Sequence, residues 1–318
     1  MDKYKTIKIN GLNLESLLLA LFLSKYNCKI YINDLINQNY TSKYNEKVYI
    51  VTNSTKIILQ ELNLWERLEK SLYDFESLSI FYNYMKEEIL IGKNDFLNEK
   101  IGWTLKYSDL KEQLLNKLFI NNNIYFLKSL NTDSFQNKYD YEFNFEDISN
   151  LSSKINKGIP FGIENKTSSI EFKVMVRGNF DKRAYQIFHK KDSIFMIPLS
   201  KNIYQIIWKG NTKKLKNRMN ININFLIDNL STILPRDFKI DQIVGGIKFF
   251  PNSLISSKNI KFKKNYIYLN NFNSASKPYI SDNLENHLND IKSLSKIFIT
   301  NKICNKNSSI YFKIRFLF

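Results

Sequence analysis

The first 33 residues constrain the fold of this chain more than any other segment. Residues Lys5–Asn10 alternate between polar and apolar side chains, as a strand does. Residues 14–26 are apolar and rich in helix-forming leucine, and residues 29–32 form a second strand-like run. Gly11 lies in the short connection after the first strand, where a sharp turn favours glycine. Two strands joined through a helix in this way predict a parallel β-α-β unit, and therefore an α/β fold.

The composition is that of a globular protein. Of its 318 residues, 43% are apolar and 24% are charged, which provides enough apolar surface for one large domain or two joined ones. The longest apolar run, at residues 17–23, is too short to span a bilayer, and the N-terminus shows no cleavable signal pattern. Two cysteines, Cys28 and Cys304, cannot form a disulfide framework or a four-ligand zinc site. We therefore expect a cytoplasmic protein.

The net charge of +17 points to an anionic partner, but the residues that produce it do not favour nucleic acid. Only six of the 47 basic residues are arginine, the side chain best suited to paired hydrogen bonds with phosphates and bases. The chain also holds 42 asparagines, and heavy use of lysine, asparagine and isoleucine is what an AT-rich genome imposes. We expect no nucleic-acid partner, while attraction to anionic lipid headgroups stays open.

The spacing of apolar residues separates predicted helices from predicted strands in the rest of the chain. Amphipathic helices are predicted at residues 54–70, 107–119, 222–234 and 283–298. Between residues 124 and 208 the pattern changes to short alternating strands, which predict a mostly antiparallel sheet. The expected fold is a Rossmann-like, dinucleotide-binding parallel sheet with an inserted antiparallel sheet on the substrate side. We expect a dinucleotide-binding domain at residues 1–123 and 250–298, an antiparallel domain at residues 124–249, and a tail at residues 299–318.

Several short motifs occur in the order found in one family of enzymes. Residues 11–16, Gly-Leu-Asn-Leu-Glu-Ser, occupy the place of a G-x-G-x-x-G turn. Ala184, Gln186 and Phe188 form an A-x-Q-x-F motif, which a Pro-Leu pair and an Ile-Trp pair follow. Residues 269–294 align without a gap with a second motif, L-x-G-D-A-A-H followed by Pro and G-Q-G-L-N. By these motifs the chain resembles the FAD-dependent aromatic hydroxylases, which are flavin monooxygenases, and most closely their ubiquinone-biosynthesis branch.

The resemblance implies a function and a set of ligands. The chain would bind FAD, take electrons from NAD(P)H and hydroxylate a polyprenylated aromatic precursor of ubiquinone. It would work as a peripheral protein at the inner membrane, or within a protein complex of quinone biosynthesis. The cofactor-binding positions that the motifs imply are Gly11, Asn13, Asp34, Lys47, Asn271, Pro278 and Asn283.

Two of these positions have a plainer explanation that stays open. Asp34 follows the second strand, where it can accept hydrogen bonds from ribose hydroxyls or simply solvate a turn together with Asn33. Lys47 stands at the family's basic position and can neutralise a phosphate, but it is also one of many lysines that would solvate the surface.

The chain departs from the family where the flavin would be held. Asn13 replaces the glycine that lets the backbone approach the pyrophosphate, and Glu15 places a negative charge beside it. Asn271 replaces the aspartate that binds the ribityl chain, and Asp282 places a carboxylate where reduced flavin is negative. These changes predict weak or lost FAD binding. The alternative function is a catalytically inactive scaffold or accessory subunit of the quinone-biosynthesis assembly with the same fold.

No other catalytic motif stands out in the sequence, so the catalytic residues stay unassigned and no metal site is expected. His189 is expected in a strand–turn region and His287 on the polar side of a helix, both as surface residues. Cys28 lies in an apolar run and is expected to be a buried thiol. Residues 309–318 interleave aromatic and cationic side chains, which suits either a membrane-surface segment or a last strand packed on the core.

Overall fold

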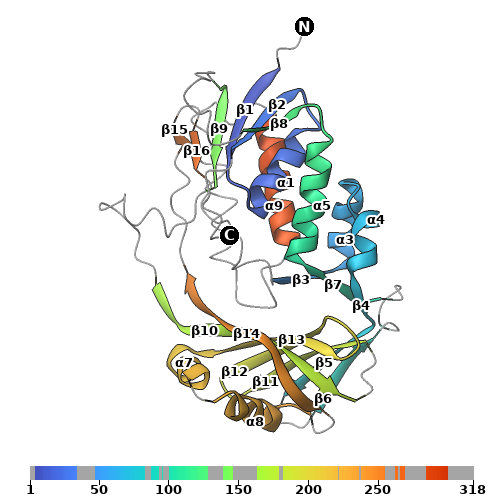
Figure 1. The fold of residues 1–318 in the computed structure, drawn as a ribbon, viewed down its shortest axis with the longest axis vertical. Coiled ribbons are helices and arrows are strands. Elements are labelled where there is room, and N and C mark those ends of the chain that lie inside the picture. The colour runs from blue at the N-terminus through green and yellow to red at the C-terminus, as the bar shows by residue number, and fades with distance from the viewer. Residues whose placement is uncertain are drawn as a thin grey trace.

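Three β-sheets form the framework of the chain, with the two larger ones at opposite ends of the molecule (Figure 1). The third, a small sheet, lies between them. The structure is a computed structural model, and it describes residues 4–33, 47–82, 87–92, 95, 100–127, 139–145, 163–178, 182–220, 222–235, 238–254, 262–263, 266–268 and 284–299.

Within the described residues, the first sheet contains six strands and is parallel except at one edge. In spatial order they are β15 (Phe262–Lys263), β16 (Tyr266–Tyr268), β9 (Tyr141–Asn144), β1 (Lys5–Asn10), β2 (Cys28–Asn33) and β8 (Ile124–Leu127). β1 and β2 pair in parallel, with Lys5 opposite Cys28. Ile7 and Ile9 of β1 are fully buried, as the alternation of the strand requires. The predicted parallel β-α-β unit is therefore confirmed.

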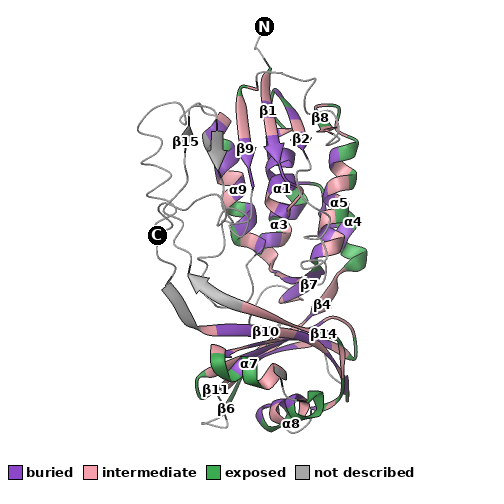
Figure 2. Cartoon of the chain, turned by 60° about the vertical axis from the view of Figure 1, so that its left-hand side comes forward, coloured by how far each residue is buried: buried purple, intermediate pink, exposed green. Residues whose placement is uncertain are grey.

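Three helices cover one face of this sheet: α1 (Leu14–Leu23), α5 (Tyr107–Phe119) and α9 (Leu284–Ile299). α1 contacts both of the others and is buried along almost its whole length (Figure 2). It ends three residues before the predicted end at residue 26. The hydroxyl of Ser24 donates to the carbonyl of Leu21 at 2.8 Å, and the chain then turns towards β2. The sheet and these helices enclose the larger hydrophobic core.

The helix predicted over residues 54–70 is two shorter helices, α3 (Asn53–Glu61) and α4 (Trp65–Leu68). They are separated at Asn63, which has a φ of +50°. Asparagine tolerates this left-handed conformation better than most residues, so the chain can turn there. The turn packs Trp65 edge-on against Trp103, with ring centres 5.0 Å apart.

The small sheet is antiparallel and joins the two larger ones. Its strands, with β7 in the middle, are β3 (Val48–Val51), β7 (Gly102–Lys106) and β4 (Tyr73–Phe75). The hydroxyl of Thr104 on β7 donates to the carbonyl of Pro198 in the third sheet at 3.0 Å. Since Thr104 is buried, this bond ties the small sheet firmly to its larger neighbour.

Gly102 of β7 has no room for a side chain. A Cβ atom there would lie 2.7 Å from the ring of buried Phe75 and 3.0 Å from the carbonyl oxygen of Val51. We expect Gly102→Ala to lower the free energy of unfolding by about 1–3 kcal/mol, because neither neighbour can move aside freely. Gly246→Ala is the control, since no atom of the described residues lies within 4 Å of its added Cβ. Denaturant unfolding measures both, and an equal effect would contradict this account of Gly102.

The third sheet contains seven strands within the described part of the chain and is antiparallel except for one pair. In spatial order they are β14 (Lys239–Leu254), β10 (Ile163–Arg177), β13 (Ile203–Asn211), β12 (Asp192–Pro198), β11 (Arg183–His189), β5 (Ser77–Tyr82) and β6 (Glu87–Gly92). α7 (Thr212–Asn220) and α8 (Ile223–Ile233) cover one face around Trp208 and Tyr204. The mostly antiparallel sheet predicted between residues 124 and 208 is confirmed for residues 170–208.

Two predicted strands lie in a different sheet from the one expected. β8 and β9 fall within the segment 124–249, which was expected to be antiparallel, yet they pair in parallel with β2 and β1. Conversely, β5 and β6 precede residue 124 and join the antiparallel sheet. This expectation was wrong because alternation in a four-residue run identifies a strand but not its partner.

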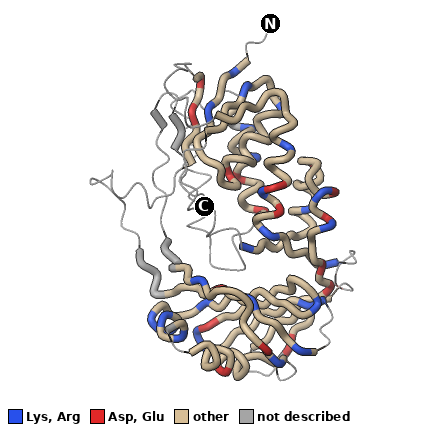
Figure 3. The backbone as a smooth tube through the Cα atoms, in the orientation of Figure 1, with Lys and Arg blue, Asp and Glu red and all other residues tan. Residues whose placement is uncertain are grey.

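Basic side chains are spread over the molecule. Lys and Arg occur on the helices of the parallel sheet, on the small sheet and around the antiparallel sheet (Figure 3). None of the described helices is long and apolar enough to cross a membrane.

Candidate functional site

The connection between β1 and α1 is a tight turn that starts at Gly11. Gly11 has a φ of +119°, which only glycine adopts without strain. Its N–H donates to the carbonyl of Asn33 at 2.9 Å, so the turn is fastened to the end of β2. The N-terminus of α1 therefore lies at the carboxyl edge of the parallel sheet, where open α/β sheets bind ligands.

Asn13 caps α1 with its own side chain. Its Oδ1 accepts the N–H of Ser16 at 2.9 Å, and the Ser16 hydroxyl donates back to the carbonyl of Asn13 at 2.8 Å. The cap stabilises the helix by about 1 kcal/mol. It also occupies one of the N–H groups that an anion at this helix end would use. The structure therefore gives Asn13 a local role that the sequence analysis did not assign.

Glu15, in the first turn of α1, is paired with His287 of α9. His287 Nδ1 lies 3.1 Å from Glu15 Oε1, and the two side chains are 4% and 13% exposed. Burial acts to raise the pKa of Glu15, but the hydrogen bond and charge of His287, with a smaller effect of Lys47, outweigh it and lower the pKa. The prediction that His287 is a surface residue on the polar side of its helix was wrong. Glu15 therefore has its hydrogen-bond partner within the protein.

Lys47 lies in the same cluster, as its charge effect on Glu15 shows. Its Nζ is 5.1 Å from the ring centre of Tyr49, and its carbonyl accepts the N–H of Tyr107 at 2.8 Å. Tyr49 in turn packs edge-on against His287 at 6.4 Å. The structure thus brings three sequence-predicted positions, Gly11, Asn13 and Lys47, to one region around the start of α1.

Three asparagines lie at the carboxyl ends of neighbouring strands of the parallel sheet. Asn10, Asn33 and Asn144 end β1, β2 and β9, and all three are buried. Nδ2 of Asn10 donates to Asn144 Oδ1 and to Glu142 Oε1. Within the described residues, Oδ1 of Asn10 and Oδ1 of Asn33 have no hydrogen-bond partner. Buried acceptors normally find a donor, so these atoms mark a place where a ligand can supply one.

The remaining cofactor positions lie outside the described residues: Asp34, Asn271, Pro278 and Asn283. The structure resumes with α9, whose first turn is fixed to α3. The carboxylate of Glu285 accepts hydrogen bonds from Thr52 at 3.0 Å and Ser54 at 2.7 Å. The start of α9 is therefore held against the N-terminus of α3.

The antiparallel sheet has a polar strip on the face away from α7 and α8. Tyr204, Ile206 and Trp208 of β13 belong to the core under these helices, so the alternating Gln205 faces the other way. Gln205 is 5% exposed, and its Oε1 has no hydrogen-bond partner within the described residues. Gln186, from the A-x-Q-x-F motif, is also buried. Gln205 was not singled out in the sequence, although its position between two buried apolar residues was a usable signal.

The other residues considered in the sequence add no catalytic group. Cys28 is buried, as predicted, and burial raises the pKa of its thiol. His189 ends β11 and is half-buried. No cluster of three or more metal-ligating side chains occurs among the residues that the structure describes. Cys304 and the segment 309–318 lie outside them.

Comparisons with known proteins identify the fold. No protein-family model and no curated protein matches the chain. PqsL from Pseudomonas aeruginosa, a probable FAD-dependent monooxygenase, matches with a TM-score of 0.68 over 94% of this chain and 88% of its own, at 9% sequence identity. p-Nitrophenol 4-monooxygenase PnpA from Pseudomonas putida DLL-E4 matches with a TM-score of 0.64 over 98% of this chain and 83% of its own, at 13% identity. The chain therefore has the fold of these two proteins.

Proposed function

We propose that this chain is an FAD-dependent monooxygenase that acts on an aromatic compound. One observation carries the proposal. The Gly11 turn and the start of α1 meet, at the carboxyl edge of the parallel sheet, two oxygens of Asn10 and Asn33 that have no partner among the described residues. In a fold shared with PqsL and PnpA, this edge is a natural place for a dinucleotide.

The described residues fit the adenosine and pyrophosphate half of FAD. The start of α1 offers N–H groups and a positive helix end to phosphate oxygens. Asn33 offers an acceptor at the end of β2, where ribose hydroxyls can donate. Because Glu15 pairs with His287 and feels the positive charge of Lys47, the repulsion of a pyrophosphate is weaker than the sequence alone predicts. When bound, FAD supplies the redox and oxygen chemistry, and the protein binds and orients the reactants.

The substrate is proposed to be a ring that carries a hydroxyl or amino group. Within the described residues, the buried Oε1 of Gln205 lacks a donor. Gln186 lies on β11, two strands away from Gln205 in the same sheet. PqsL has been crystallised with 2-aminobenzoylacetate, and PnpA is a p-nitrophenol monooxygenase. Within this proposal, the sequence resemblance favours a polyprenylated precursor of ubiquinone, NAD(P)H as the reductant and peripheral membrane association.

The second candidate function is a non-catalytic scaffold in a quinone-biosynthesis assembly. The observation that favours it is the cap made by Asn13, whose side chain occupies the N–H of Ser16. A bound pyrophosphate would have to displace this cap or forgo that hydrogen bond. If FAD cannot displace it, the fold would persist without its cofactor.

Asn13→Gly separates the two candidates. Removing the side chain frees the N–H of Ser16 and the space beside it, so we expect FAD to bind roughly tenfold more tightly, at a stability cost of only a few tenths of a kcal/mol. Asn13→Ser is the control, because serine keeps a cap and a Cβ atom and should leave the affinity nearly unchanged. Flavin fluorescence quenching measures all three proteins. Failure of both Asn13→Gly and the wild-type chain to bind FAD would favour the scaffold.

Incorporation of an oxygen atom from oxygen gas into the product tests the monooxygenase proposal. The purified protein is supplied with FAD, NADPH and a panel of hydroxy- and amino-substituted aromatic compounds under isotopically labelled oxygen gas. We expect one labelled oxygen atom in a hydroxylated product, detected by mass spectrometry. NADPH oxidation that yields only hydrogen peroxide with every compound would contradict a hydroxylase of this substrate class.

A further inference from the structure

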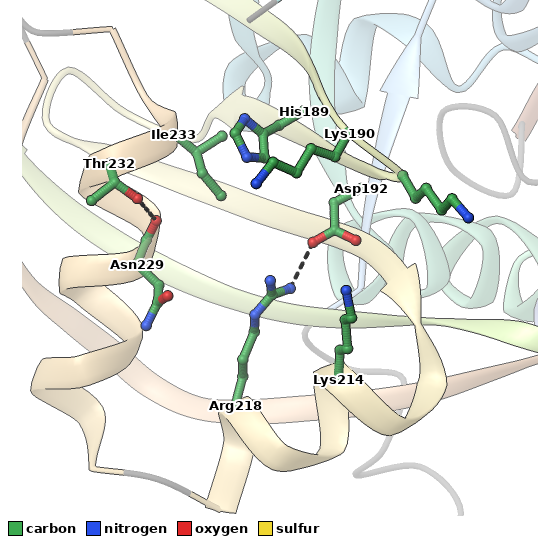
Figure 4. A pocket seen from close by; sticks show the side chains of 9 residues that line it. His189, Lys190, Asp192, Lys214, Arg218, Asn229, Thr232 and Ile233 are labelled. Carbon is green, nitrogen blue, oxygen red and sulfur yellow. Dashed lines mark hydrogen bonds and ion pairs between the residues drawn. The ribbon is translucent and has the colours of Figure 1, made fainter.

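The face of the antiparallel sheet that carries α7 and α8 contains a depression of about 670 Å³ (Figure 4). The β11–β12 turn and the two helices surround it. Four of its side chains are cationic, Lys190, Lys191, Lys214 and Arg218, and one is a carboxylate, Asp192. It lies on the opposite face of the sheet from Gln205, so it is separate from the proposed flavin and substrate site.

Arg218 is held rigidly in this depression. Its Nη1 donates to Asp192 Oδ2 at 2.7 Å, and its guanidinium carbon lies 4.4 Å from the centre of the Trp208 ring. The side chain is only 20% exposed. Figure 4 shows the guanidinium extending from α7 into the depression. A guanidinium that is already fixed loses little conformational entropy when its remaining N–H groups bind a ligand.

The carboxylate of Asp192 accepts hydrogen bonds from other residues of the protein. Besides Arg218, it accepts the indole N–H of Trp208 at 3.3 Å. Gly210 makes this possible, because a Cβ at that position would lie 2.4 Å from Asp192 Oδ1. Lys190 and Lys214 are exposed, and neither forms an ion pair with another residue in the described part of the chain. The depression therefore keeps an excess of positive charge after its internal pair is formed.

We propose that this depression binds the phosphate group of an organic phosphate. Lys214 and Arg218 are four residues apart on α7 and share one face of the helix, while Lys190 approaches from the β11–β12 turn. Three cations from two directions suit a doubly charged group with several acceptor oxygens. The volume exceeds what a phosphate needs and falls in the range of ligand pockets. The organic part of the ligand has room beside Asn229 and Thr232.

Binding of inorganic pyrophosphate and of phenyl phosphate by isothermal titration calorimetry tests the proposal. The double variant Lys190→Gln/Lys214→Gln removes two exposed cations without touching the Arg218–Asp192 pair. We expect it to weaken saturable binding by roughly tenfold or more, because each lost partner is a charge-assisted hydrogen bond. The matched control is Lys201→Gln/Lys213→Gln, which removes the same charge from exposed positions outside the depression and should change the affinity by less than about twofold.

Three results would overturn the proposal: no saturable binding to the wild-type chain, an equal loss of affinity in both double variants, or phosphate binding that depends on bound flavin.

A flotation assay with phosphatidylcholine vesicles, with and without phosphatidic acid, identifies the source of the phosphate. Vesicle binding that pyrophosphate competes away, and that only Lys190→Gln/Lys214→Gln weakens, assigns the phosphate to a lipid headgroup. Saturable phenyl phosphate binding without vesicle binding assigns it to a free metabolite. Neither result depends on the monooxygenase proposal.

Discussion

His287→Ala is expected to lower the free energy of unfolding by about 3 kcal/mol at neutral pH, because it leaves a buried carboxylate without its hydrogen-bond partner. The substitution leaves the carboxylate of Glu15 in α1 without the group that lies 3.1 Å away, while its side chain stays only 13% exposed. It also removes a buried ring that packs against Tyr49. Chemical denaturation followed by circular dichroism measures the loss.

The pH dependence of this loss has a defined sign. In the wild-type chain the pKa of Glu15 is lowered, so the pairing stabilises the fold above the ordinary carboxyl pKa and is lost as the pH falls through the lowered pKa. In His287→Ala the lowering effect of His287 is gone, and burial raises the pKa of Glu15. Protonation of Glu15 then removes the buried negative charge as the solution is acidified, and the destabilisation of the variant decreases. The difference in stability between the two proteins should therefore shrink as the pH falls through the carboxyl range, from the raised pKa of Glu15 in the variant to its lowered pKa in the wild-type chain. A difference that is constant with pH would contradict the pairing.

Glu15→Gln provides the control for this prediction. Glutamine keeps the shape of the side chain and an acceptor for His287 but carries no charge. His287→Ala made in the Glu15→Gln background should cost about 1–2 kcal/mol less than in the wild-type background, because the ring is lost in both but a buried carboxylate loses its partner only in the wild-type background. An equal cost in both backgrounds would assign the effect to packing of the imidazole alone.

Gly11→Val is expected to abolish FAD binding and to destabilise the fold by about 1–3 kcal/mol. Valine cannot adopt the φ of +119° at this turn without strain, and its branched side chain would shift the start of α1. The hydrogen bond from the Gly11 N–H to the carbonyl of Asn33 depends on that turn, and so does the approach of a pyrophosphate. FAD binding is measured at a temperature well below the unfolding transition of the variant.

Gly245→Val is the matched control for Gly11→Val. Gly245 lies in β14 and has a φ of +79°, and no atom of the described residues lies within 4 Å of an added Cβ. The substitution should therefore strain the backbone similarly but leave the FAD affinity unchanged. If both variants lost FAD equally, the loss would come from general destabilisation and the assignment of Gly11 to the cofactor site would be wrong.

The sequence was most informative where a local pattern determines the structure. Alternation in β1, a leucine-rich segment and Gly11 were enough to predict the parallel β-α-β unit. The helix over residues 107–119 was predicted at its observed bounds, because one apolar stripe faces the core. Gly11 and Asn13 could be placed together for the same reason, since both belong to the connection between β1 and α1. Lys47 precedes β3 of the small sheet, so only the family resemblance indicated it.

Contacts between residues far apart in the chain could not be predicted from the sequence. The partners of β8 and β9 were predicted wrongly, since a short alternating run fits either kind of sheet. The Glu15–His287 pair joins residues at opposite ends of the chain, so no local pattern could reveal it. One signal for the burial of His287 was present. It lies three residues after Leu284 and four before Ile291, which places it on the apolar stripe of α9.

Titration of the wild-type chain with FAD tests the central claim most directly. Asn13 and the other departures from the flavin motifs each remove about 1 kcal/mol of contact, so the affinity should be about a thousandfold below that of a tightly bound flavin, in the micromolar range. We predict saturable quenching of flavin fluorescence with one FAD per chain, and none with Gly11→Val. No saturation with FAD at about millimolar concentration, where a binding free energy is only some 4 kcal/mol, would contradict the claim that this fold holds a flavin.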